Sequence, residues 1–489
     1  MTGASLLTIG SAVNNNITAE LLIESGGIFN TGTGQTLVRN SGTLTVNAGG
    51  TLNVSGDFTL VSGVTLTNDG DITFSNSSTV QLAGPIANNG TIRLDGHILA
   101  SGTGLVSVSN DGIIEVDGEA SMAFTNVSQQ MLLTNRNELR ILTDPTTPGQ
   151  LRIAGADPIA GQSVTLDNTG GTITIGVFAA LEFLDGESTL RGGTINGAGN
   201  VVVSRVGGFM SHLILEGGVT LDGVTVDVSP GDQLTLRDSL TNNATVRADS
   251  GNPTIDVPVE LAEFTVGNVG GNLFVNAQLT TAVLNWNAGA FHGTGSVVVT
   301  GTGTIDPANG QGLNNLQLVN QGDMTWTDGD FGGNAGTLRN EGQFTIDLTT
   351  ARNFSPSAVN TAGGTITLQG GMPAFGPPMN NAGLVQVDGG VLVIISAPVQ
   401  HVGSVLTGGS WDVRDNATLN FIAGSDIVTN QGTVILRGPG SVFTKIDSLA
   451  DNQGTFEIHD ARNFDTVGKL TNSGQRRLKA RCPTAPTAV

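Results

Sequence analysis

The chain has 489 residues, of which 71 are glycine, 12% are charged and 38% are hydrophobic, and it contains no tyrosine. The hydrophobic fraction is higher than in disordered chains, and the glycines lack the three-residue period of collagen, so a folded protein rich in turns is predicted. The net charge of −21, from 41 acidic and 20 basic residues, disfavours nucleic acids and anionic membrane surfaces as partners.

The cysteine content and the length of the apolar runs limit which disulfides and membrane spans the chain can form. The one cysteine, Cys482, predicts that no disulfide forms within the chain. The longest apolar runs, such as residues 391–395, are far shorter than the roughly 18 residues of a membrane span, so no direct membrane insertion is predicted. The first ten residues do not resemble a signal peptide. We therefore expect either an intracellular protein or an internal piece of a longer exported protein, and the repeats described next favour the second.

A short motif, Asn-x-Gly followed by alternating apolar and polar residues, repeats from about residue 40. Copies begin at Asn68, Asn88 and Asn110, at spacings of 20 and 22 residues. Residues two apart after the glycine are apolar, for example Ile92 and Leu94, which is the period of a strand with one buried face. Each period fits one coil of a parallel β-helix with two or three strands per coil.

The repeat weakens between residues 127 and 161, where prolines gather. Because proline cannot donate to a strand ladder, Pro145, Pro148 and Pro158 are expected in loops or at coil corners. We interpret the region as looser loops on continuing coils, with an inserted excursion as the alternative. The pattern weakens again at residues 251–258. Residues 1–260 are predicted to form the N-terminal coils.

The most regular repeats lie between Asn320 and Val387. Four segments there begin with asparagine at intervals of 20 residues, at Asn320, Asn340, Asn360 and Asn380. Asparagine and glycine tolerate the positive φ of tight turns, so these residues are predicted in turns, where their side chains can hydrogen-bond from coil to coil. Residues 261–475 are predicted to form C-terminal coils continuous with the first, and residues 476–489 a disordered basic tail.

Two copies of Trp-x-x-Gly-x-Phe-x-Gly begin at Trp286 and Trp326, 40 residues apart. The spacing equals two coils, so the aromatic side chains are interpreted as stacked core or corner packing. An exposed aromatic ladder that stacks on sugar rings is the alternative.

These repeats resemble those of bacterial extracellular β-helix repeat proteins, of the autotransporter passenger and filamentous-haemagglutinin adhesin type. The resemblance rests on Asn-x-Gly-Thr-Leu/Ile-x-Val and on phrases such as residues 42–54, and it covers most of residues 30–474. It implies an extracellular or cell-surface protein, outer membrane-associated and often adhesive. The motifs specify the shape of a coil and carry no chemistry.

The predicted fold is all-β: a single long right-handed parallel β-helix (solenoid) with coils of about 20–22 residues, its hand being the usual one for parallel crossovers. The expected function is that of a structural, adhesive rod. It would bind host or neighbour-cell surfaces, matrix or glycans through multivalent weak contacts. No catalytic residue, cofactor or metal ligand is predicted, and any specific function is expected where the repeat weakens, near residues 127–161 or 251–258.

A polysaccharide-active lyase or hydrolase is the first alternative, because β-helices also carry such enzymes. It would need carboxylates beside an arginine or lysine on one face of adjacent coils. Solvation is the simpler interpretation of the best candidate cluster. That cluster comprises Asp222, Asp227, Asp232, Arg237 and Asp238.

A water-ordering or ice-binding protein is the second alternative. Outward pairs of threonine, such as Thr43 with Thr45 and Thr65 with Thr67, could order water, but they recur irregularly and threonine is a common strand residue. The histidines show no metal-ligand spacing. They are His97, His212, His292, His401 and His459.

Overall fold

The computed structural model describes residues 6–479 except 10–14, 18–19, 33–35, 40–41, 62, 76–79, 95–97, 101–105, 125–129, 143–148, 155–162, 207–208, 238–243, 249–250, 268–270 and 307–310. These residues are all-β without a helix, and parallel strands recurring about 22 residues apart form a β-solenoid, which confirms the predicted fold class. The described part of the chain therefore contains no helix that is long and apolar enough to cross a membrane. The chain divides into two compact units, Met1–Ala262 and Glu263–Val489.

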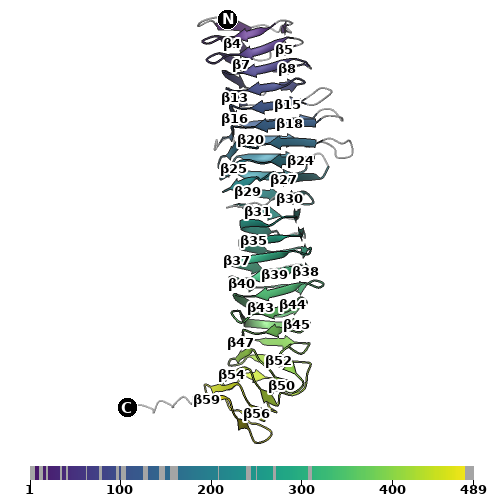
Figure 1. Ribbon diagram of the computed structural model, residues 1–489, viewed down its shortest axis with the longest axis vertical. Coiled ribbons are helices and arrows are strands. Elements are labelled where there is room, and N and C mark those ends of the chain that lie inside the picture. The colour runs from purple at the N-terminus through teal and green to yellow at the C-terminus, as the bar shows by residue number, and fades with distance from the viewer. Residues whose placement is uncertain are drawn as a thin grey trace, which may run out of the picture. The chain divides into compact units, whose positions relative to one another are not determined.

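Three parallel ladders build the first unit, because each coil contributes three short strands that pair with their counterparts in the next coil (Figure 1). The first ladder comprises β1 (Leu6–Ile9), β4 (Ile28–Thr31), β7 (Thr51–Val54), β10 (Asp71–Phe74), β13 (Thr91–Leu94), β16 (Ile113–Val116), β19 (Glu138–Ile141), β22 (Thr172–Ile175), β25 (Thr194–Gly197) and β28 (Thr220–Asp222). The second comprises β2 (Asn15–Ile17), β5 (Thr36–Arg39), β8 (Asp57–Leu60), β11 (Val80–Leu82), β14 (Ile98–Ala100), β17 (Glu119–Phe124), β20 (Gln150–Ala154), β23 (Ala180–Leu184), β26 (Asn200–Ser204), β29 (Thr225–Val228) and β31 (Thr245–Ala248). The third comprises β3 (Leu21–Ile23), β6 (Thr43–Val46), β9 (Thr65–Asn68), β12 (Ile86–Asn88), β15 (Val106–Asn110), β18 (Gln130–Asn135), β21 (Ser163–Asp167), β24 (Gly186–Arg191), β27 (Ser211–Glu216), β30 (Gln233–Leu236) and β32 (Asn252–Ile255).

β33 (Val259–Val266) includes residues on both sides of the division after Ala262. The second unit is built of the same kind of coil, with several longer strands. Its first strands are β34 (Asn272–Val275), β35 (Gln278–Trp286), β36 (Ala290–His292), β37 (Ser296–Ile305), β38 (Gln311–Asn314), β39 (Gln317–Asn320), β40 (Asp323–Trp326), β41 (Phe331–Gly332), β42 (Thr337–Asn340), β43 (Gln343–Phe354), β44 (Ser357–Asn360), β45 (Thr365–Phe375), β46 (Asn380–Asn381), β47 (Leu384–Val387) and β48 (Val391–Ile394). The remainder are β49 (His401–Val402), β50 (Val405–Leu406), β51 (Ser410–Val413), β52 (Thr418–Phe421), β53 (Thr429–Asn430), β54 (Thr433–Arg437), β55 (Val442–Phe443), β56 (Asp451–Asn452), β57 (Thr455–His459), β58 (Thr471–Asn472) and β59 (Gln475–Lys479). β49 and β50 pair antiparallel, whereas the ladders around them are parallel.

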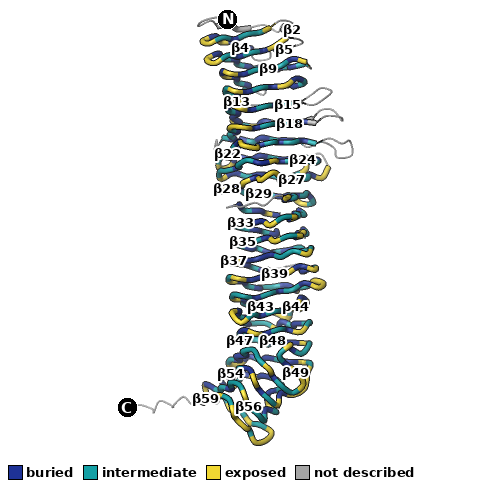
Figure 2. The backbone as a smooth tube through the Cα atoms, in the orientation of Figure 1, coloured by how far each residue is buried: buried dark blue, intermediate teal, exposed yellow. Residues whose placement is uncertain are grey.

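Burial alternates along the strands, as the apolar pattern predicts. In β10, Ile72 and Phe74 are buried, whereas Asp71 is exposed and Thr73 is half-buried. Figure 2 shows the same alternation from coil to coil within each unit. Because side chains of a strand point alternately to its two faces, every coil sends one set into the core and the other to solvent.

Ladders of buried asparagine run from coil to coil in both units, as predicted. The side-chain amide nitrogen (Nδ2) of Asn320 donates to Oδ1 of Asn340 at 2.8 Å, and Asn340 donates in the same way to Asn360. Two details differ from the prediction. These asparagines end strands without a positive φ, and the fourth member is Asn381, because it is Asn381 rather than Asn380 that accepts from Asn360, at 2.8 Å.

The region between residues 127 and 161 continues the solenoid. Its strands β18, β19 and β20 pair with the strands of the preceding and following coils, and Asn135 joins the asparagine ladder by donating to Asn168 at 2.6 Å. Continuing coils are thus seen for the described residues. Pro145, Pro148 and Pro158 lie outside them.

The other two irregular regions also contain ladder strands. Residues 251–258 include β32, which pairs with β30 and buries Pro253 and Ile255. Gln475–Lys479 form β59, paired in parallel with β57, so strand structure extends beyond residue 476, where the disordered tail was predicted to begin. Residues 480–489 lie outside the described part of the chain.

The tryptophan motifs form core structure, which confirms the packing interpretation. Trp286, Trp326 and Trp411 are fully buried, so they offer no exposed ladder for sugar rings. The indole nitrogen (Nε1) of Trp286 donates to the carbonyl of Ala288 at 3.0 Å, and that of Trp326 donates to the carbonyl of Asp328 at 2.8 Å. Both copies therefore satisfy their one polar group in the turn that follows the strand.

Candidate functional site

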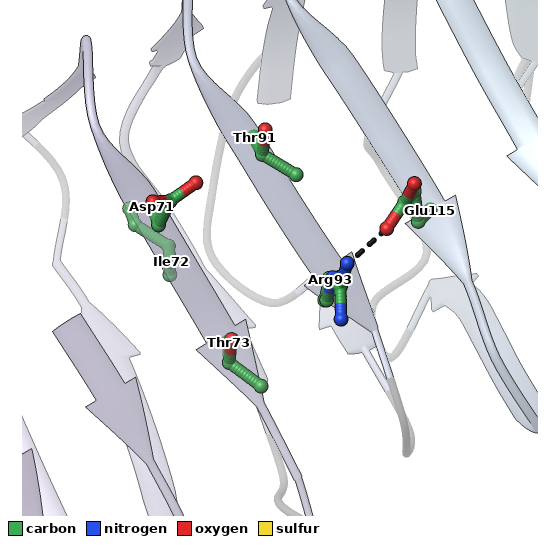
Figure 3. Close-up of a pocket in the computed structure, with 6 residues that line it drawn as sticks. All are labelled: Asp71, Ile72, Thr73, Thr91, Arg93 and Glu115. Atoms are coloured by element: carbon green, nitrogen blue, oxygen red, sulfur yellow. Dashed lines mark ion pairs between the residues drawn. The ribbon is translucent and has the colours of Figure 1, made fainter. Parts of the chain in front are cut away.

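A hollow of about 310 Å³ lies on the outer face of the first ladder, in the first unit. Its lining comes from three adjacent strands, β10, β13 and β16. Figure 3 shows the six residues, with the Arg93 side chain directed at Glu115. They are Asp71, Ile72, Thr73, Thr91, Arg93 and Glu115.

Register explains why these polar groups meet. Arg93, Glu115 and Arg140 are direct partners across three successive strands, so their side chains stand in one outward row. The Nε atom of Arg93 lies 2.8 Å from Oε2 of Glu115, and Nη1 of Arg140 lies 3.2 Å from Oε1 of the same carboxylate. Arg140 also binds Oε2 of Glu138 through Nη2 at 2.6 Å.

The contact between Arg140 and Glu138 favours the charged form of each. The hydrogen bond from Arg140 holds the pKa of Glu138 below its ordinary value, and the same contact raises the pKa of Arg140. Arg93 is the most solvent-exposed member, with 63% of its side chain accessible, whereas Glu115 is nearly buried. Arg93 and Arg140 thus present guanidinium donors to solvent, which suits hydrogen bonding to hydroxyl groups.

Similar rows occur on other outward faces. Arg152, on the second ladder, pairs with Glu119 of the preceding coil and, at 2.9 Å, with Glu182 of the following coil. In the second unit, Nε of Arg339 lies 2.6 Å from Oε1 of Glu341, two residues further along the same coil, which is a pair and not a row. Isolated exposed pairs of this kind contribute roughly 0–1 kcal/mol to folding, so their repetition matters mainly for the surface they create.

The acidic cluster considered for catalysis is not assembled. Asp222 lies on β28 of the first ladder, and Asp227 lies on β29 of the second. Asp232 is in the turn before β30, Arg237 follows that strand, and Asp238 lies outside the described residues. Because the three ladders form different faces of the coil, this sequence neighbourhood does not form one site.

Asp232 is nevertheless unusual, because its side chain is fully buried. Its Oδ1 accepts a hydrogen bond from the backbone N–H of Ser211 at 2.9 Å and lies 3.6 Å from Nε of Arg205. Among the described residues, its Oδ2 has no hydrogen-bond partner. Burial raises the pKa of Asp232, and the Ser211 hydrogen bond and the Arg205 charge offset only part of that rise.

We expect Asp232→Asn to leave the protein at least as stable as the wild type at neutral pH. Between about pH 4, where an unfolded aspartate titrates, and its raised folded pKa, Asp232 holds a proton that the unfolded chain has released. Stability should therefore fall as pH rises through this interval, and the neutral amide removes that loss while still accepting from Ser211. Thermal unfolding followed from about pH 4 to 7 checks this.

Asp222→Asn is the matched control, because it removes the same charge from an exposed position. The stability of this variant should depend on pH in the same way as the stability of the wild type. A lower melting temperature for Asp232→Asn than for the wild type at neutral pH would mean that the ion pair with Arg205 outweighs the burial of the carboxylate.

The four histidines that the structure describes lie on four different strands. Burial lowers the pKa values of His212 and His401. His292 contacts Oδ1 of Asn272 at 3.3 Å, and His459 contacts Oε2 of Glu457 at 2.8 Å, while His97 lies outside the described residues. Across the part that the structure describes, no three His, Cys, Asp or Glu side chains are grouped so that they could hold a metal ion.

The paired threonines form a small array. Thr43 and Thr45 of β6 stand in register with Thr65 and Thr67 of β9. The next strand, β12, places Ala87 beside Thr67. The four hydroxyls therefore span two coils, which is a short surface for ordering water.

The row of Arg93, Glu115 and Arg140 was not predicted, although the sequence contains a signal for it. Each residue lies five positions after a ladder asparagine, namely Asn88, Asn110 and Asn135. Aligning the repeats on asparagine would have placed these opposite charges side by side. Comparison with protein-family models gave no match, and comparisons with curated proteins and with solved structures gave no significant match.

Proposed function

We propose that this chain is a structural, adhesive β-solenoid of an extracellular or cell-surface protein. It binds glycans, matrix or neighbouring cell surfaces through many weak contacts, and it acts without chemical turnover. The observation that carries this proposal is the outward row on the first ladder, where paired strands place polar side chains at matching positions on successive coils.

Spacing supports recognition of an extended polymer. Neighbouring strands are about 4.8 Å apart, so equivalent outward positions recur at that interval along the ladder. Four successive strands place a hydroxyl, a guanidinium, a carboxylate and a second guanidinium in one row. These groups belong to Thr73, Arg93, Glu115 and Arg140. A glycan chain lying along the ladder would meet a donor or an acceptor at each coil.

The exposure of the row predicts low affinity for each contact. Arg93 is largely in solvent, and exposed charged groups compete with water for their partners. Linking many such contacts raises the overall affinity by roughly 10²–10⁴ when the geometry allows simultaneous binding. A repeating surface with weak individual contacts is the arrangement expected of an adhesin.

The test compares the full chain coupled densely to beads with the same chain free in solution. We expect the beads to bind immobilised polysaccharides or fixed cells, and the free chain to bind them at least about 10² times more weakly. Arg93→Gln combined with Arg140→Gln should lower bead binding, whereas Arg152→Gln on another face should lower it less.

Two outcomes would contradict the proposal. Beads that bind none of the polysaccharides, matrix preparations or cells would exclude adhesion by this chain. Release of new reducing ends from a polysaccharide, at a rate proportional to the concentration of the chain, would show an enzyme.

A further inference from the structure

A second hollow, of about 450 Å³, lies in the second unit, within the roughly 300–1,000 Å³ range of small-molecule sites. Its residues come from the ends of β51, β54 and β57 and the turns that follow them, in three successive coils. They are Arg414, Asp415, Arg437, Gly438, Pro439 and Asp460.

Carboxylate and amide acceptors contact the two arginines. Nε of Arg437 donates to Oδ1 and Oδ2 of Asp412 at 3.0 and 3.1 Å, and Asp412 is only 4% exposed. Arg414 donates from Nη2 to Oε1 of Gln386 at 2.9 Å, and its Nε lies 3.1 Å from Oδ1 of Asp388. Both guanidinium groups are thereby fixed in orientation before any ligand binds.

Donor groups remain available on the side of the hollow. Within the described residues, both Nη atoms of Arg437 and Nη1 of Arg414 have no hydrogen-bond partner. A guanidinium presents its N–H groups in a rigid planar fork. Two such forks on adjacent coils therefore offer several donors at fixed positions.

Carboxylates supply acceptors at the rim. Oδ1 of Asp415 accepts a hydrogen bond from the backbone N–H of Gly440 at 2.8 Å. This bond orients the carboxylate and leaves Oδ2 as the acceptor for a ligand. Asp460 is exposed, and it and Ala461 both have positive φ, at 56° and 61°. Two consecutive non-glycine residues in this region of backbone space are strained, and strain of this kind is concentrated at binding sites.

Gly438 and Pro439 also line the hollow. A Cβ on Gly438 would lie 2.6 Å from Cβ of Asp415, so this position accepts no side chain while the turns are stacked as they are. Pro439 is exposed and presents a rigid apolar ring. Polar groups around one small apolar surface match a sugar, which has hydroxyls at its edge and C–H groups on its faces.

Charge balance selects among sugars. Asp388 and Asp412 pair with the two arginines, and Asp415 and Asp460 line the same hollow, so four carboxylates accompany two guanidinium groups. An anionic ligand would gain little attraction and would approach two carboxylates. Uncharged vicinal hydroxyls can accept from a guanidinium and donate to a carboxylate at the same time.

We propose that this hollow binds one uncharged hexose unit of a glycan chain. Arg414 and Arg437 donate to its hydroxyl oxygens, Asp415 and Asp460 accept from its hydroxyl groups, and Pro439 contacts a C–H face. The inference rests on the proposed adhesive function and assigns it a subsite and a ligand class.

Isothermal titration calorimetry of the full chain with neutral oligomers of glucose, galactose and mannose tests the assignment. We expect at least one of them to bind with a Kd between roughly 1 μM and 1 mM. Arg437→Lys keeps a cation beside Asp412 but removes the planar fork, and Asp460→Gly removes an acceptor while relieving the positive φ. Each should weaken binding at least about tenfold.

Arg339→Lys is the matched control, because this arginine belongs to the same unit, pairs with one carboxylate and lies outside the hollow. It should leave binding unchanged. The proposal is overturned if no neutral oligomer binds at millimolar concentration, or if Arg437→Lys and Asp460→Gly bind as well as the wild type. Tighter, salt-sensitive binding of oligogalacturonate would also overturn it.

The bead assay separates this inference from the function on which it rests. The subsite alone is refuted if beads carrying Arg437→Lys still adhere and the wild-type chain binds no hexose oligomer. If wild-type beads do not adhere but the wild-type chain binds hexose oligomers in solution, adhesion is refuted and the subsite is supported.

Discussion

Gly342→Ala is expected to destabilise the second unit by about 3 kcal/mol or more, the largest effect of any change considered. Gly342 has no positive φ, so an alanine meets no intrinsic backbone strain there. Its Cβ, however, would lie 2.2 Å from the carbonyl oxygen of Gly322 in the preceding coil. The oxygen is a backbone atom and the Cβ is bonded directly to the backbone, so neither can rotate away. Relieving the clash would require neighbouring coils to separate.

Tryptophan fluorescence can follow this prediction, because all three tryptophans of the chain lie in the second unit and are buried. Urea unfolding should show an earlier midpoint for Gly342→Ala. Gly363→Ala is the matched control, because it is in the same unit, also lacks a positive φ and has its nearest backbone atom at 3.6 Å. That substitution should be neutral or slightly stabilising, since alanine restricts the unfolded chain. Equal midpoints for the two variants would contradict close coil stacking.

Asn340→Ala is expected to cost about 2–4 kcal/mol. The Asn340 side chain is 1% exposed; it accepts from Asn320 and donates to Oδ1 of Asn360 at 2.8 Å and to the carbonyl of Thr365 at 3.0 Å. Alanine would leave polar groups of both neighbouring coils without these partners in a buried position. Asn320 retains its bond to the carbonyl of Gln343, so the loss falls mainly on the following coil.

Gln321→Ala is the control for the ladder, because Gln321 is adjacent to Asn320 and makes an exposed hydrogen bond to Glu341 at 3.1 Å. It should change stability by less than about 0.5 kcal/mol. Urea unfolding followed by tryptophan fluorescence again provides the measurement, and hydrogen exchange at the Thr361 and Thr365 amides would locate the weakened coil. Similar losses for Asn340→Ala and Gln321→Ala would mean that the buried ladder adds nothing beyond an ordinary surface contact.

These two predictions explain the recurring Asn-x-Gly sequence in terms that differ from turn propensity. The asparagine is conformationally ordinary and is required for a hydrogen bond between coils. The glycine in Gly322 and Gly342 is required because a neighbouring carbonyl approaches too closely for any Cβ. Turn chemistry predicts the same residue types, so the sequence pattern alone did not distinguish the two causes.

The two hollows lie outside the regions where the repeat weakens. Residues 251–258 include the ladder strand β32, and residues 127–161 include the ladder strands β18, β19 and β20. The hollow near Arg93 uses regularly repeated strands, and the hollow near Arg437 uses turns after such strands. Outward positions are free to vary in a solenoid because the core and the ladders hold the coil, so regular coils can carry sites as readily as irregular ones.

The sequence by itself determined the coil. Alternating apolar residues such as Ile92 and Leu94 specify which face is buried, and asparagines about 20 residues apart specify the length of chain that returns to the same position. Both are local or periodic properties. The tertiary structure alone decided which residues of different coils touch, because loop lengths that vary between coils set the register. That register brings Arg93 to Glu115 and Arg437 to Asp412, and it places Asp222 and Asp227 on separate faces although they are close in sequence.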